Sequence, residues 1–473
     1  METILRMTGR QHELLQAHLF PGDGNEAVAV ALCGRRAGEL RHALTVRKIV
    51  PVPYEACPVR TPVRVTWATD RVLPPLLDEA ARRGMALLKI HSHPGGLAEF
   101  SETDDESDRA LFPSVYGWAD GSHPHASAVI LPDGRVFGRV IGEDGSFDPL
   151  ALVSVSGDDL RFFWHASDGA ESLPEFARRH TQAFGAGTIS ALRRLSVAVV
   201  GCSGTGSPVI EQLARLGVGR LVIVDPDKIE EKNLNRILNA TREDARLGRL
   251  KVEVLARAID RMGLGTEVVP LARNLFDPDV AREVAGCDVL FGCMDSVDGR
   301  HLLNRLAVFY SIPYFDVGVK LVADGKGGIE QICGTVHYLQ PDGSSLLSRG
   351  VYTLEQMQAA ALKRTNPAVY RNQVREKYIV GVQEDRPAVI SVNMQLAAAA
   401  VNELLARLHN YRDDGNTPFA VNRVSLTQAQ SYFEPDGEPC HVLARHAGRG
   451  DVTPPLEMPE LSEGESLAPG LAA

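Results

Sequence analysis

Two histidines and an aspartate stand close enough in the sequence to hold a metal ion together. The run His91-Ser92-His93-Pro94 ends a short apolar segment, Leu87–His91, and is followed by Ser101 and Asp104. Residues two apart on a strand point to the same side of the sheet, so the two imidazoles would share a face. Imidazole nitrogens suit Zn²⁺, and an aspartate can supply a third ligand. Three protein ligands leave a position for water, which is typical of catalytic zinc.

A zinc ion held in this way would lower the pKa of its bound water to about 7. A nearby carboxylate would then be needed to move the proton, and a hydroxyl donor could stabilise the oxyanion of a tetrahedral intermediate. The alternative is that His91 and His93 are ordinary histidines at a strand end, and the HxH pair alone would favour it. Because Ser101 and Asp104 also follow close behind, the sequence favours a zinc hydrolase site.

The same stretch resembles the JAMM (MPN-plus, JAB) metalloprotease family. The family pattern is an upstream glutamate, then HxH, seven residues that begin with proline, and SxxD. Here seven residues, 94–100, separate His93 from Ser101, and Asp104 ends the motif. The resemblance implies His91, His93 and Asp104 as zinc ligands and Ser101 as the hydroxyl on the oxyanion side. Asp105 competes with Asp104 for the third position, but the spacing favours Asp104.

The resemblance also implies a catalytic glutamate and a class of substrate. The family's glutamate lies on an early strand that ends in Leu-x-Gly, and Glu26 fits that place, one residue further from Gly34 than the pattern. Members hydrolyse amide or isopeptide bonds at the C-terminus of ubiquitin or ubiquitin-like proteins. Other proteins of the wider fold have lost the metal and serve as scaffolds, whereas the ligands are present here.

A glycine-rich run further along the chain is typical of a phosphate-binding turn. Residues 201–207 read Gly-Cys-Ser-Gly-Thr-Gly-Ser, follow the predicted strand Val197–Val200 and open a predicted helix. Glycines permit a tight turn and a close approach to phosphates, and a helix N-terminus favours anions. Asp225, 24 residues after Gly201, ends the next strand, where an acidic residue normally holds a ribose hydroxyl. Alone, this motif would favour an NAD-dependent dehydrogenase.

Four further motifs displace that interpretation. They are Asp225-Pro226-Asp227, Asn233-Leu234-Asn235-Arg236, Leu247-Gly248-Arg249-Leu250-Lys251, and Cys293-Met294-Asp295-Ser296 followed by Arg300. Together with the glycine run they resemble the ThiF/MoeB/ubiquitin-activating adenylation family over about residues 175–410. Ser203 stands where that family usually has glycine.

The resemblance implies adenylation, in which a protein carboxylate attacks the α-phosphate of ATP and pyrophosphate leaves. Negative charge gathers on phosphate oxygens in the transition state, so cations must surround it. Arg236 and Lys251 are implied as those catalytic cations, Asp295 as the Mg²⁺ ligand, and Arg179 as an arginine from the preceding helix that often acts across a dimer. The full implied nucleotide-binding set is Gly201, Gly204, Gly206, Asp225, Asp227, Asn233, Arg236, Lys251, Arg179 and Asp295.

Two features of that family are missing from this sequence. The stretch expected to carry a zinc-binding CxxC pair reads Ser345-Leu346-Leu347-Ser348, and the loop Glu376–Pro387 before the last long helix has no cysteine. Cys333 and Cys440 are the cysteines downstream, with Cys333 read as a buried strand thiol, and Cys202 lies in the glycine turn. Three routes stay open: direct transfer of the adenylate to an acceptor, an oxyester on a serine or threonine, or a thioester on an unplaced cysteine.

Composition excludes several classes of protein. Of 473 residues, 44% are hydrophobic and 23% charged, which is ordinary for globular domains, and the net charge of −10 argues against a nucleic-acid binder. No apolar run is long enough for a membrane helix, and the first 16 residues have no apolar core of a secretory signal. Seven cysteines without a CxxC pair indicate reduced thiols in a cytoplasm.

Hydrophobic periodicity predicts two different architectures along the chain. The N-terminal part should hold strands at Glu26–Gly34, Leu44–Val52, Leu87–His91, Ala126–Leu131 and Arg135–Val140 and a helix at Leu73–Met85. From Leu195, strands alternate with helices: strands at Ser196–Val200, Arg220–Val224, Thr266–Leu271, Val289–Gly292 and Pro313–Val317, helices at Pro208–Leu216, Lys251–Met262, Val280–Val284, Gly299–Tyr310 and Val389–Leu408. Such alternation is typical of a doubly wound, mostly parallel sheet.

The expected fold class is therefore α/β, with an N-terminal MPN (JAB) α+β domain followed by a Rossmann-like ThiF adenylation domain. The predicted boundaries are 1–150 for the zinc peptidase domain, 151–175 for a linker that includes a loop at Ser154–Asp159, 176–445 for the adenylation domain, and 446–473 for a disordered acidic tail.

The sequence predicts two enzymes on one chain that use Zn²⁺, ATP and Mg²⁺ and share a ubiquitin-like (β-grasp) partner. A conjugating enzyme, a homodimer through the adenylation domain and a setting in bacterial antiviral defence are implied by the resemblance alone, and neither nucleic acid nor a membrane is expected as a partner. Two alternatives stay open. One is activation of a sulfur carrier for cysteine, thiamin or molybdopterin synthesis, and the other is a non-catalytic scaffold.

Overall fold

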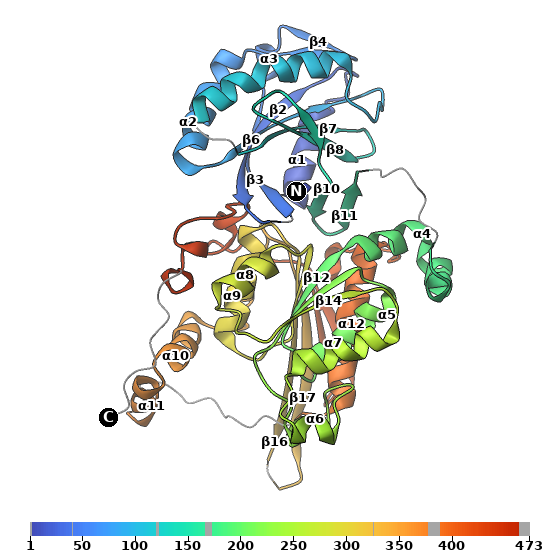
Figure 1. Ribbon diagram of the computed structural model, residues 1–473, viewed down its shortest axis with the longest axis vertical. Helices are drawn as coiled ribbons and strands as arrows, with labels where there is room; N and C mark the ends of the chain where they lie inside the picture. Colours follow the sequence, from blue (N-terminus) through green and yellow to red (C-terminus); the bar gives the residue numbers. More distant parts are fainter. Residues whose placement is uncertain are drawn as a thin grey trace. The chain divides into compact units, whose positions relative to one another are not determined.

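The computed structural model describes residues 2–39, 41–119, 123–165, 173–324, 326–376 and 388–462 (Figure 1). The chain divides into two compact units, which are described separately. Unit 1 contains Met1–Ala170 with two short later segments, Phe309–Ser311 and His446–Val452. Unit 2 contains the remainder. Within the described ranges, every helix is too short or too polar to cross a lipid bilayer.

Unit 1 is built on a nine-stranded sheet with the order β11-β10-β1-β3-β2-β6-β7-β8-β9. Its strands are β1 (Glu2–Thr8), β2 (Val28–Arg36), β3 (Arg41–Pro51), β6 (Ala86–Ser92), β7 (His125–Ile130), β8 (Val136–Ile141), β9 (Phe147–Pro149), β10 (Leu152–Ser156) and β11 (Leu160–Trp164). The helices are α1 (Gly9–Leu19), α2 (Thr69–Arg83) and α3 (Glu102–Ala119), and a separate hairpin is formed by β4 (Val59–Thr61) and β5 (Arg64–Thr66).

Both faces of this sheet are covered, which explains the continuous apolar character of its central strands. Along β2, Ala29 and Ala31 point into the cluster that contains Leu15 of α1. Val30, on the other face, joins the cluster formed with α2 and with Phe112 of α3. The α3 helix, which carries Asp104, is therefore anchored over the same face of the sheet as α2 (Figure 1).

Unit 2 is built on an eight-stranded sheet with the order β14-β13-β12-β15-β16-β17-β18-β19. The strands are β12 (Ser196–Val200), β13 (Arg220–Val224), β14 (Glu267–Leu271), β15 (Val289–Gly292), β16 (Tyr314–Ala323), β17 (Ile329–Leu339), β18 (Val421–Ser425) and β19 (Gln430–Glu434). The first five strands in this order pair in parallel, from β14 to β16, and the last three are antiparallel.

Helices cover both sides of the parallel part, with α5, α7 and α12 on one side and α8 and α9 on the other (Figure 1). The helices of this unit are α4 (Arg178–Arg194), α5 (Gly206–Leu216), α6 (Arg242–Arg246), α7 (Lys251–Met262), α8 (Pro278–Ala285), α9 (Val297–Phe309), α10 (Leu354–Thr365), α11 (Pro367–Arg375) and α12 (Ile390–Leu408). The predicted α/β class and the doubly wound, mostly parallel sheet are confirmed.

The structure corrects the predicted linker at 151–175. Residues Leu152–Ser156 form β10, which pairs in parallel with β1 and antiparallel with β11, so the first sheet extends beyond residue 150. The loop predicted at Ser154–Asp159 is wrong in its first half for the same reason. Ser154 and Ser156 suggested a loop because they are polar, but both are buried, and the Ser156 hydroxyl lies 3.3 Å from the Ser311 carbonyl oxygen.

The predicted disordered tail at 446–473 is also wrong for its first part, 446–462. Gly34 N donates a hydrogen bond to Gly448 O at 3.2 Å, and Arg35 forms a parallel bridge with Gly450. Leu456 and Leu461 are buried. The polar, proline-rich composition suggested disorder, but backbone hydrogen bonds to a strand distant in sequence do not depend on composition. Residues 463–473 lie outside the described residues.

Candidate functional site

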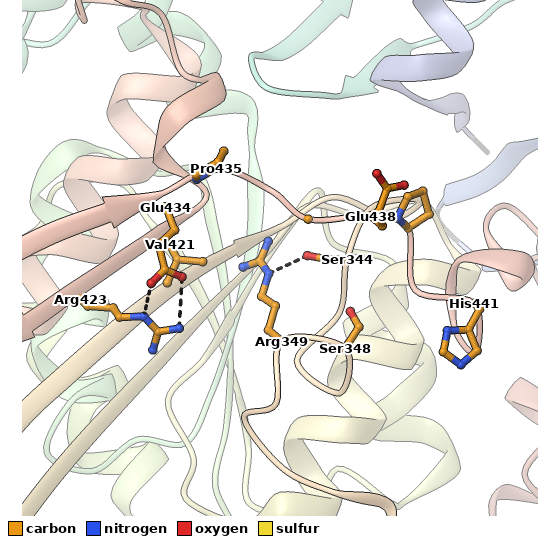
Figure 2. Close-up of a pocket in the computed structure, with 11 residues that line it drawn as sticks. Ser344, Ser348, Arg349, Val421, Arg423, Glu434, Pro435, Glu438 and His441 are labelled. Carbon is orange, nitrogen blue, oxygen red and sulfur yellow. Dashed lines mark hydrogen bonds and ion pairs between the residues drawn. The ribbon is translucent and has the colours of Figure 1, made fainter.

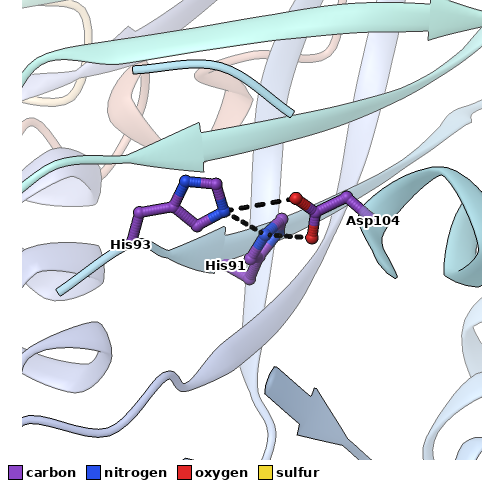
Figure 3. A group of neighbouring side chains, drawn as sticks. All are labelled: His91, His93 and Asp104. Atoms are coloured by element: carbon purple, nitrogen blue, oxygen red, sulfur yellow. Dashed lines mark hydrogen bonds and ion pairs between the residues drawn. The ribbon is translucent and has the colours of Figure 1, made fainter. Parts of the chain in front are cut away.

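The three predicted metal ligands converge in unit 1 (Figure 3). His91 lies near the end of β6, His93 follows that strand, and Asp104 lies in the first turn of α3. The Nε2 atom of His91 is 2.9 Å from Asp104 Oδ1, and the Nε2 atom of His93 is 3.3 Å from Asp104 Oδ2. The two Nε2 atoms are 3.1 Å apart. Among the described residues, this is the group of histidine, cysteine and acidic side chains whose geometry could hold a metal ion.

The donor set fits zinc. The Nδ1 atom of His93 is 2.8 Å from the carbonyl oxygen of Leu97. A carbonyl oxygen only accepts, so Nδ1 carries the proton and Nε2 keeps its lone pair for a metal. All three ligand residues are buried, where two imidazoles and a carboxylate are an ordinary zinc set. Burial opposes it, but the neighbouring His91 and His93 rings and the Ser101 hydroxyl hold the pKa of Asp104 well below its usual range.

Ser101 and Asp104 form a reciprocal cap at the start of α3. The backbone N–H and the hydroxyl of Ser101 each lie 2.7 Å from Asp104 Oδ2, and Asp104 N–H donates to Ser101 Oγ at 3.2 Å. This arrangement satisfies backbone donors at a helix N-terminus and fixes the direction of the aspartate side chain. The SxxD spacing therefore both caps the start of α3 and orients the Asp104 carboxylate toward the two histidines. Asp105 points elsewhere, toward Arg109 and Arg139.

Glu26 lies beside the metal ligands because of the pairing between β2 and β6. Val28 is opposite His91, and Ser92 N–H donates to Ala27 O at 3.1 Å, so the register continues to Glu26 opposite His93. Glu26 is only 5% exposed. Burial, helped by the nearby Asp104 carboxylate, raises the pKa of Glu26 to about 7. A carboxyl group that titrates near neutrality is suited to proton exchange.

The glycine turn of unit 2 follows β12 and opens α5. Gly201 has φ +95°, and a Cβ on it would lie 2.6 Å from Cys293 O. A Cβ on Gly206 would lie 1.7 Å from Gly201 O. No side chain fits at either position, so both glycines are required by the close packing of the turn. The helix N-terminus that follows it can receive an anion.

Asp225, Asp227 and Lys251 lie together beside this turn. Cys202 N–H donates to Asp225 Oδ2 at 2.8 Å, and Asp227 N–H donates to Asp225 Oδ1 at 2.9 Å. Lys251 Nζ lies 3.4 Å from Asp225 Oδ1 and 2.7 Å from Asp227 Oδ2. Burial would lower the pKa of Lys251, but the two carboxylates raise it, so the buried amine stays charged. The predicted DxD motif and lysine are thus brought together.

Arg236 and Asn393 both lie against Gly204, the middle glycine of the turn. Asn393 was not predicted from the sequence. A Cβ on Gly204 would lie 2.3 Å from Asn393 Nδ2 and 3.2 Å from Arg236 Cδ. The Arg236 guanidinium donates to Lys232 O at 2.8 Å. Asn393 is a buried residue of α12. The one sequence signal for Asn393 is a polar residue on the buried face of an otherwise apolar, alanine-rich helix.

Other predicted nucleotide residues have different surroundings. Asn233 is buried, and its Oδ1 accepts from Glu230 N–H at 3.0 Å, which stabilises the local turn. Asp295 follows β15 and is exposed, two residues from Cys293, whose carbonyl oxygen borders Gly201. Arg179 is exposed on α4, and no contact among the described residues joins it to the glycine turn.

The stretch 345–348, where relatives were expected to carry zinc cysteines, is closed by hydroxyls. Ser345 N–H donates to Ser348 Oγ at 2.9 Å, and Ser348 N–H donates to Ser345 Oγ at 3.1 Å. The next residue, Arg349, lines a pocket of about 360 Å³ (Figure 2) and donates to Ser344 Oγ at 2.7 Å and to Asp436 Oδ1 at 2.8 Å. Hydrogen bonds among hydroxyl, guanidinium and carboxylate groups thus stabilise this region.

The structure does not single out one cysteine as the acceptor of an activated carboxylate. All seven are free thiols. Cys202 is buried, and burial raises its pKa well above its usual value, which disfavours the thiolate. Cys333 is only partly buried on β17, opposite Lys320 and Ser425, so the expectation of a fully buried thiol does not hold. The loop predicted to lack a nucleophile, 376–387, lies outside the described residues from 377 onward.

Two family profiles match different parts of the chain. The sequence profile of the ThiF family matches residues 177–438, which is 262 of 473 residues and more than half of the chain. The profile of prokaryotic homologs of the JAB domain matches residues 10–139. The E. coli MccB structure with MccA-N7isoASN aligns with a TM-score of 0.45 at 20% identity, covering 57% of this chain and 75% of that one.

Two curated relatives match over parts of their length. The SAMP-activating enzyme E1 of Haloferax volcanii is 34% identical over 147 residues, 31% of this chain and 50% of that protein. The adenylyltransferase and sulfurtransferase MOCS3 of Mus musculus is 37% identical over 122 residues, 26% of each chain. The chain thus spans a quarter to a half of the length of these relatives. The chain belongs to the ThiF family and carries an N-terminal domain of the prokaryotic JAB group.

Proposed function

We propose that this chain is a bifunctional enzyme that acts on the C-terminal end of a ubiquitin-like protein. Unit 2 activates the terminal carboxylate with ATP, and unit 1 cleaves an amide or isopeptide bond at the same terminus. The observation that carries the proposal is the pair of assembled sites: three converging metal donors in unit 1, and a glycine turn with Lys251 and Arg236 beside it in unit 2.

In the hydrolytic half, His91, His93 and Asp104 would hold zinc. Bound zinc supplies a Lewis acid that makes water nucleophilic at neutral pH. Glu26 accepts the proton of that water and returns it to the leaving amine, since its buried carboxyl group lies beside the ligands. The Ser101 hydroxyl, which donates to Asp104 Oδ2 in the free chain, would turn its proton to the carbonyl oxygen of the substrate as negative charge develops on that oxygen.

In the activating half, the carboxylate oxygen of the partner forms a bond to the α-phosphorus of ATP, and the bond to pyrophosphate breaks. The glycine turn and the N-terminus of α5 receive phosphate oxygens. Lys251 and Arg236 balance the charge that gathers in the transition state. Asp295 would hold Mg²⁺, and Arg179 would complete the site from α4 or from a second copy of the chain.

The relatives support a protein substrate. One is named a SAMP-activating enzyme E1, and others are adenylyltransferases and sulfurtransferases. Placing both activities on one chain raises the effective concentration of a shared partner. A sulfur carrier is the second candidate partner, favoured by the name of the MOCS3 relatives, while the absence of zinc cysteines at 345–348 weighs against that route. A conjugating enzyme and a homodimer remain predictions.

The test of the activating half is ATP–pyrophosphate exchange with purified β-grasp proteins. Wild-type chain should exchange label only when a partner with a free C-terminal carboxylate is present, and Lys251→Ala should not. Exchange by Lys251→Ala at the wild-type rate, or no exchange with any β-grasp protein, would contradict the adenylation proposal. A linear fusion of the same partner to a reporter tests the hydrolytic half, and cleavage that survives a strong chelator would contradict it.

A further inference from the structure

A buried ionic network lies next to the metal ligands and contains none of them. It consists of Lys89 on β6, Arg139 on β8, and Asp105 and Asp108 on α3, and we call it the α3 clamp. Lys89 Nζ is 2.7 Å from Asp108 Oδ1. Arg139 reaches Asp108 Oδ2 at 2.7 Å through Nη2 and at 3.1 Å through Nε, and its Nη1 contacts Asp105.

Sheet register explains why the two cations meet one carboxylate. Lys89 pairs with Ser127 of β7, and Ser127 pairs with Arg139, so these three residues form one row across three strands. Residues opposite one another share a face of the sheet, and α3 covers that face. Asp108 therefore lies over the row and bridges the cations on either side of Ser127. The clamp ties one helix to two strands that are not neighbours.

The clamp and the metal ligands are coupled by short covalent paths. Lys89 stands two residues before His91 on β6, so both side chains leave the same face of the strand. Asp108 stands four residues after Asp104 on α3, so both carboxylates lie on one face of the helix, a turn apart. The clamp thus holds α3 against β6 at a point two residues from His91 on the strand and one turn from Asp104 on the helix.

Arg139 also fixes the segment that leads into the helix. Its guanidinium carbon lies 3.9 Å from the ring centre of Phe100 and 3.8 Å from that of Phe147. Phe100 immediately precedes Ser101, which caps α3 and donates to Asp104. A planar guanidinium can stack and form paired hydrogen bonds at once, which a lysine cannot do.

The burial of the clamp indicates a geometric role. The side chains of Lys89, Asp108 and Arg139 are 4%, 0% and 6% exposed. Burying charges costs desolvation, and apolar side chains of similar size often stabilise a core as well or better. The best-attested benefit of such groups is to select one arrangement of packed elements. Here the element selected is α3, and the residue it presents is Asp104.

We propose that Lys89, Asp108 and Arg139 are positioning residues that hold Asp104 in the geometry of a third metal ligand. The clamp acts through the placement of α3 and touches neither metal nor substrate. This inference rests on the hydrolytic half of the proposed function. Residues that orient metal ligands typically change metal affinity by about 10- to 100-fold when they are replaced.

The test measures zinc affinity by competition with a chromophoric chelator and the absorption bands of the Co²⁺-substituted full-length chain. Arg139→Lys keeps the buried positive charge but loses the ring stacking and the paired hydrogen bonds. We expect its zinc dissociation constant to rise about 10-fold, that of Asp108→Asn to rise about 100-fold, and the Co²⁺ bands of both to shift. Leu15→Ala, in the cluster on the opposite face of the sheet, is the control for lost stability alone. It should keep the wild-type affinity and spectrum.

Each outcome separates the clamp from the function on which it rests. Zinc affinity and Co²⁺ bands unchanged in a folded Arg139→Lys chain would overturn the clamp and leave the hydrolytic proposal intact. An equal loss of affinity in Leu15→Ala would overturn it too, because general destabilisation would then explain the effect. A wild-type chain that binds no zinc would overturn the hydrolytic proposal itself. If Asp108→Asn does not fold, Arg139→Lys and Arg139→Ala decide the question.

Discussion

The two sites of this chain are assembled in opposite ways. The predicted metal ligands come from 14 consecutive residues, His91 to Asp104, which run from the end of β6 through a loop to the start of α3. The predicted nucleotide site draws on β12, β13, α7 and α12, between Gly201 and Asn393. The first set lies close together in the sequence, although α3 must still pack on β6 to bring Asp104 to His91, whereas the second set requires most of the unit 2 sheet. Close spacing was enough to indicate the first set from the sequence, whereas the second was indicated by a series of separate motifs, and its contact with Asn393 was not predicted.

The two sites also differ in how their charged groups are balanced. In the metal site, two imidazoles and a carboxylate point at one another with no fixed cation among them. In the nucleotide site, Lys251 is already paired with Asp225 and Asp227. The metal site is thus arranged to receive a cation, while the cation beside the glycine turn is held in place by protein carboxylates.

The largest effects should come from removing one essential side chain from each site and measuring both activities in each variant. His93→Ala should abolish zinc binding, measured as metal content, and reporter cleavage, because one of three ligands is lost. Lys251→Ala should lower ATP–pyrophosphate exchange by about 10²- to 10³-fold, because a cation beside the phosphates is lost. Each variant should leave the other activity at its wild-type level. Loss of both activities in either variant would show that the sites are not independent.

The charge state of Glu26, beside the predicted metal ligands, can be tested through the pH dependence of the free energy of unfolding. The pKa of Glu26 is about 7 in the folded chain, above the ordinary glutamate value of 4.5. Ionisation as the pH rises from 4.5 through 7 therefore costs stability, so Glu26→Gln should stabilise the metal-free chain at pH 8 by about 3 kcal/mol and have little effect at pH 4. Urea unfolding of the metal-free chain at both pH values measures this. A pH-independent effect of Glu26→Gln would contradict it.

The distributed site can be broken and partly repaired at Gly204. Gly204→Ala would place a Cβ 2.3 Å from Asn393 Nδ2, so either the Asn393 side chain or the turn must shift, and ATP affinity should fall by about 10²-fold. Adding Asn393→Ala removes that obstacle and should recover part of the affinity, which isothermal calorimetry can measure. Gly187→Ala is the matched control, because a Cβ there meets nothing within 4 Å. Equal affinities of the single and double variants would contradict the contact.

The smallest effect is expected at the serine turn of unit 2. Ser345→Ala removes the acceptor of Ser348 N–H and should lower the free energy of unfolding by about 1 kcal/mol. Neither zinc content nor reporter cleavage should change, because this turn is closed by hydroxyls. Thermal unfolding and metal analysis of the variant test both statements. A fall in zinc content would show that a second metal site exists in this region.

Periodicity closely predicted the parallel strands of unit 2 and the main helices between them. The bounds of β12, β13, β15 and α7 agree with the predicted segments at both ends. These elements are buried strands and an amphipathic helix, whose apolar patterns are strong and end at glycine or acidic residues. The short strands β10 and β11 of unit 1 were not predicted. In β10, Ser154 and Ser156 carry no apolar signal, and the strand is held by pairing with β1, which is distant in the sequence.

The sequence by itself indicated which residues are the candidate metal ligands and how the Ser101–Asp104 cap directs the aspartate, because strand alternation and a helix cap are local rules. It also indicated the glycine turn between a strand and a helix, where Gly206 is required locally because a Cβ on it would lie 1.7 Å from Gly201 O. Only the tertiary structure decided that Asn393 meets Gly204, that Arg139 bridges to Asp108, and that residues near 450 pair with β2. Those contacts join segments far apart in the chain, and which distant segments meet depends on how the whole core packs.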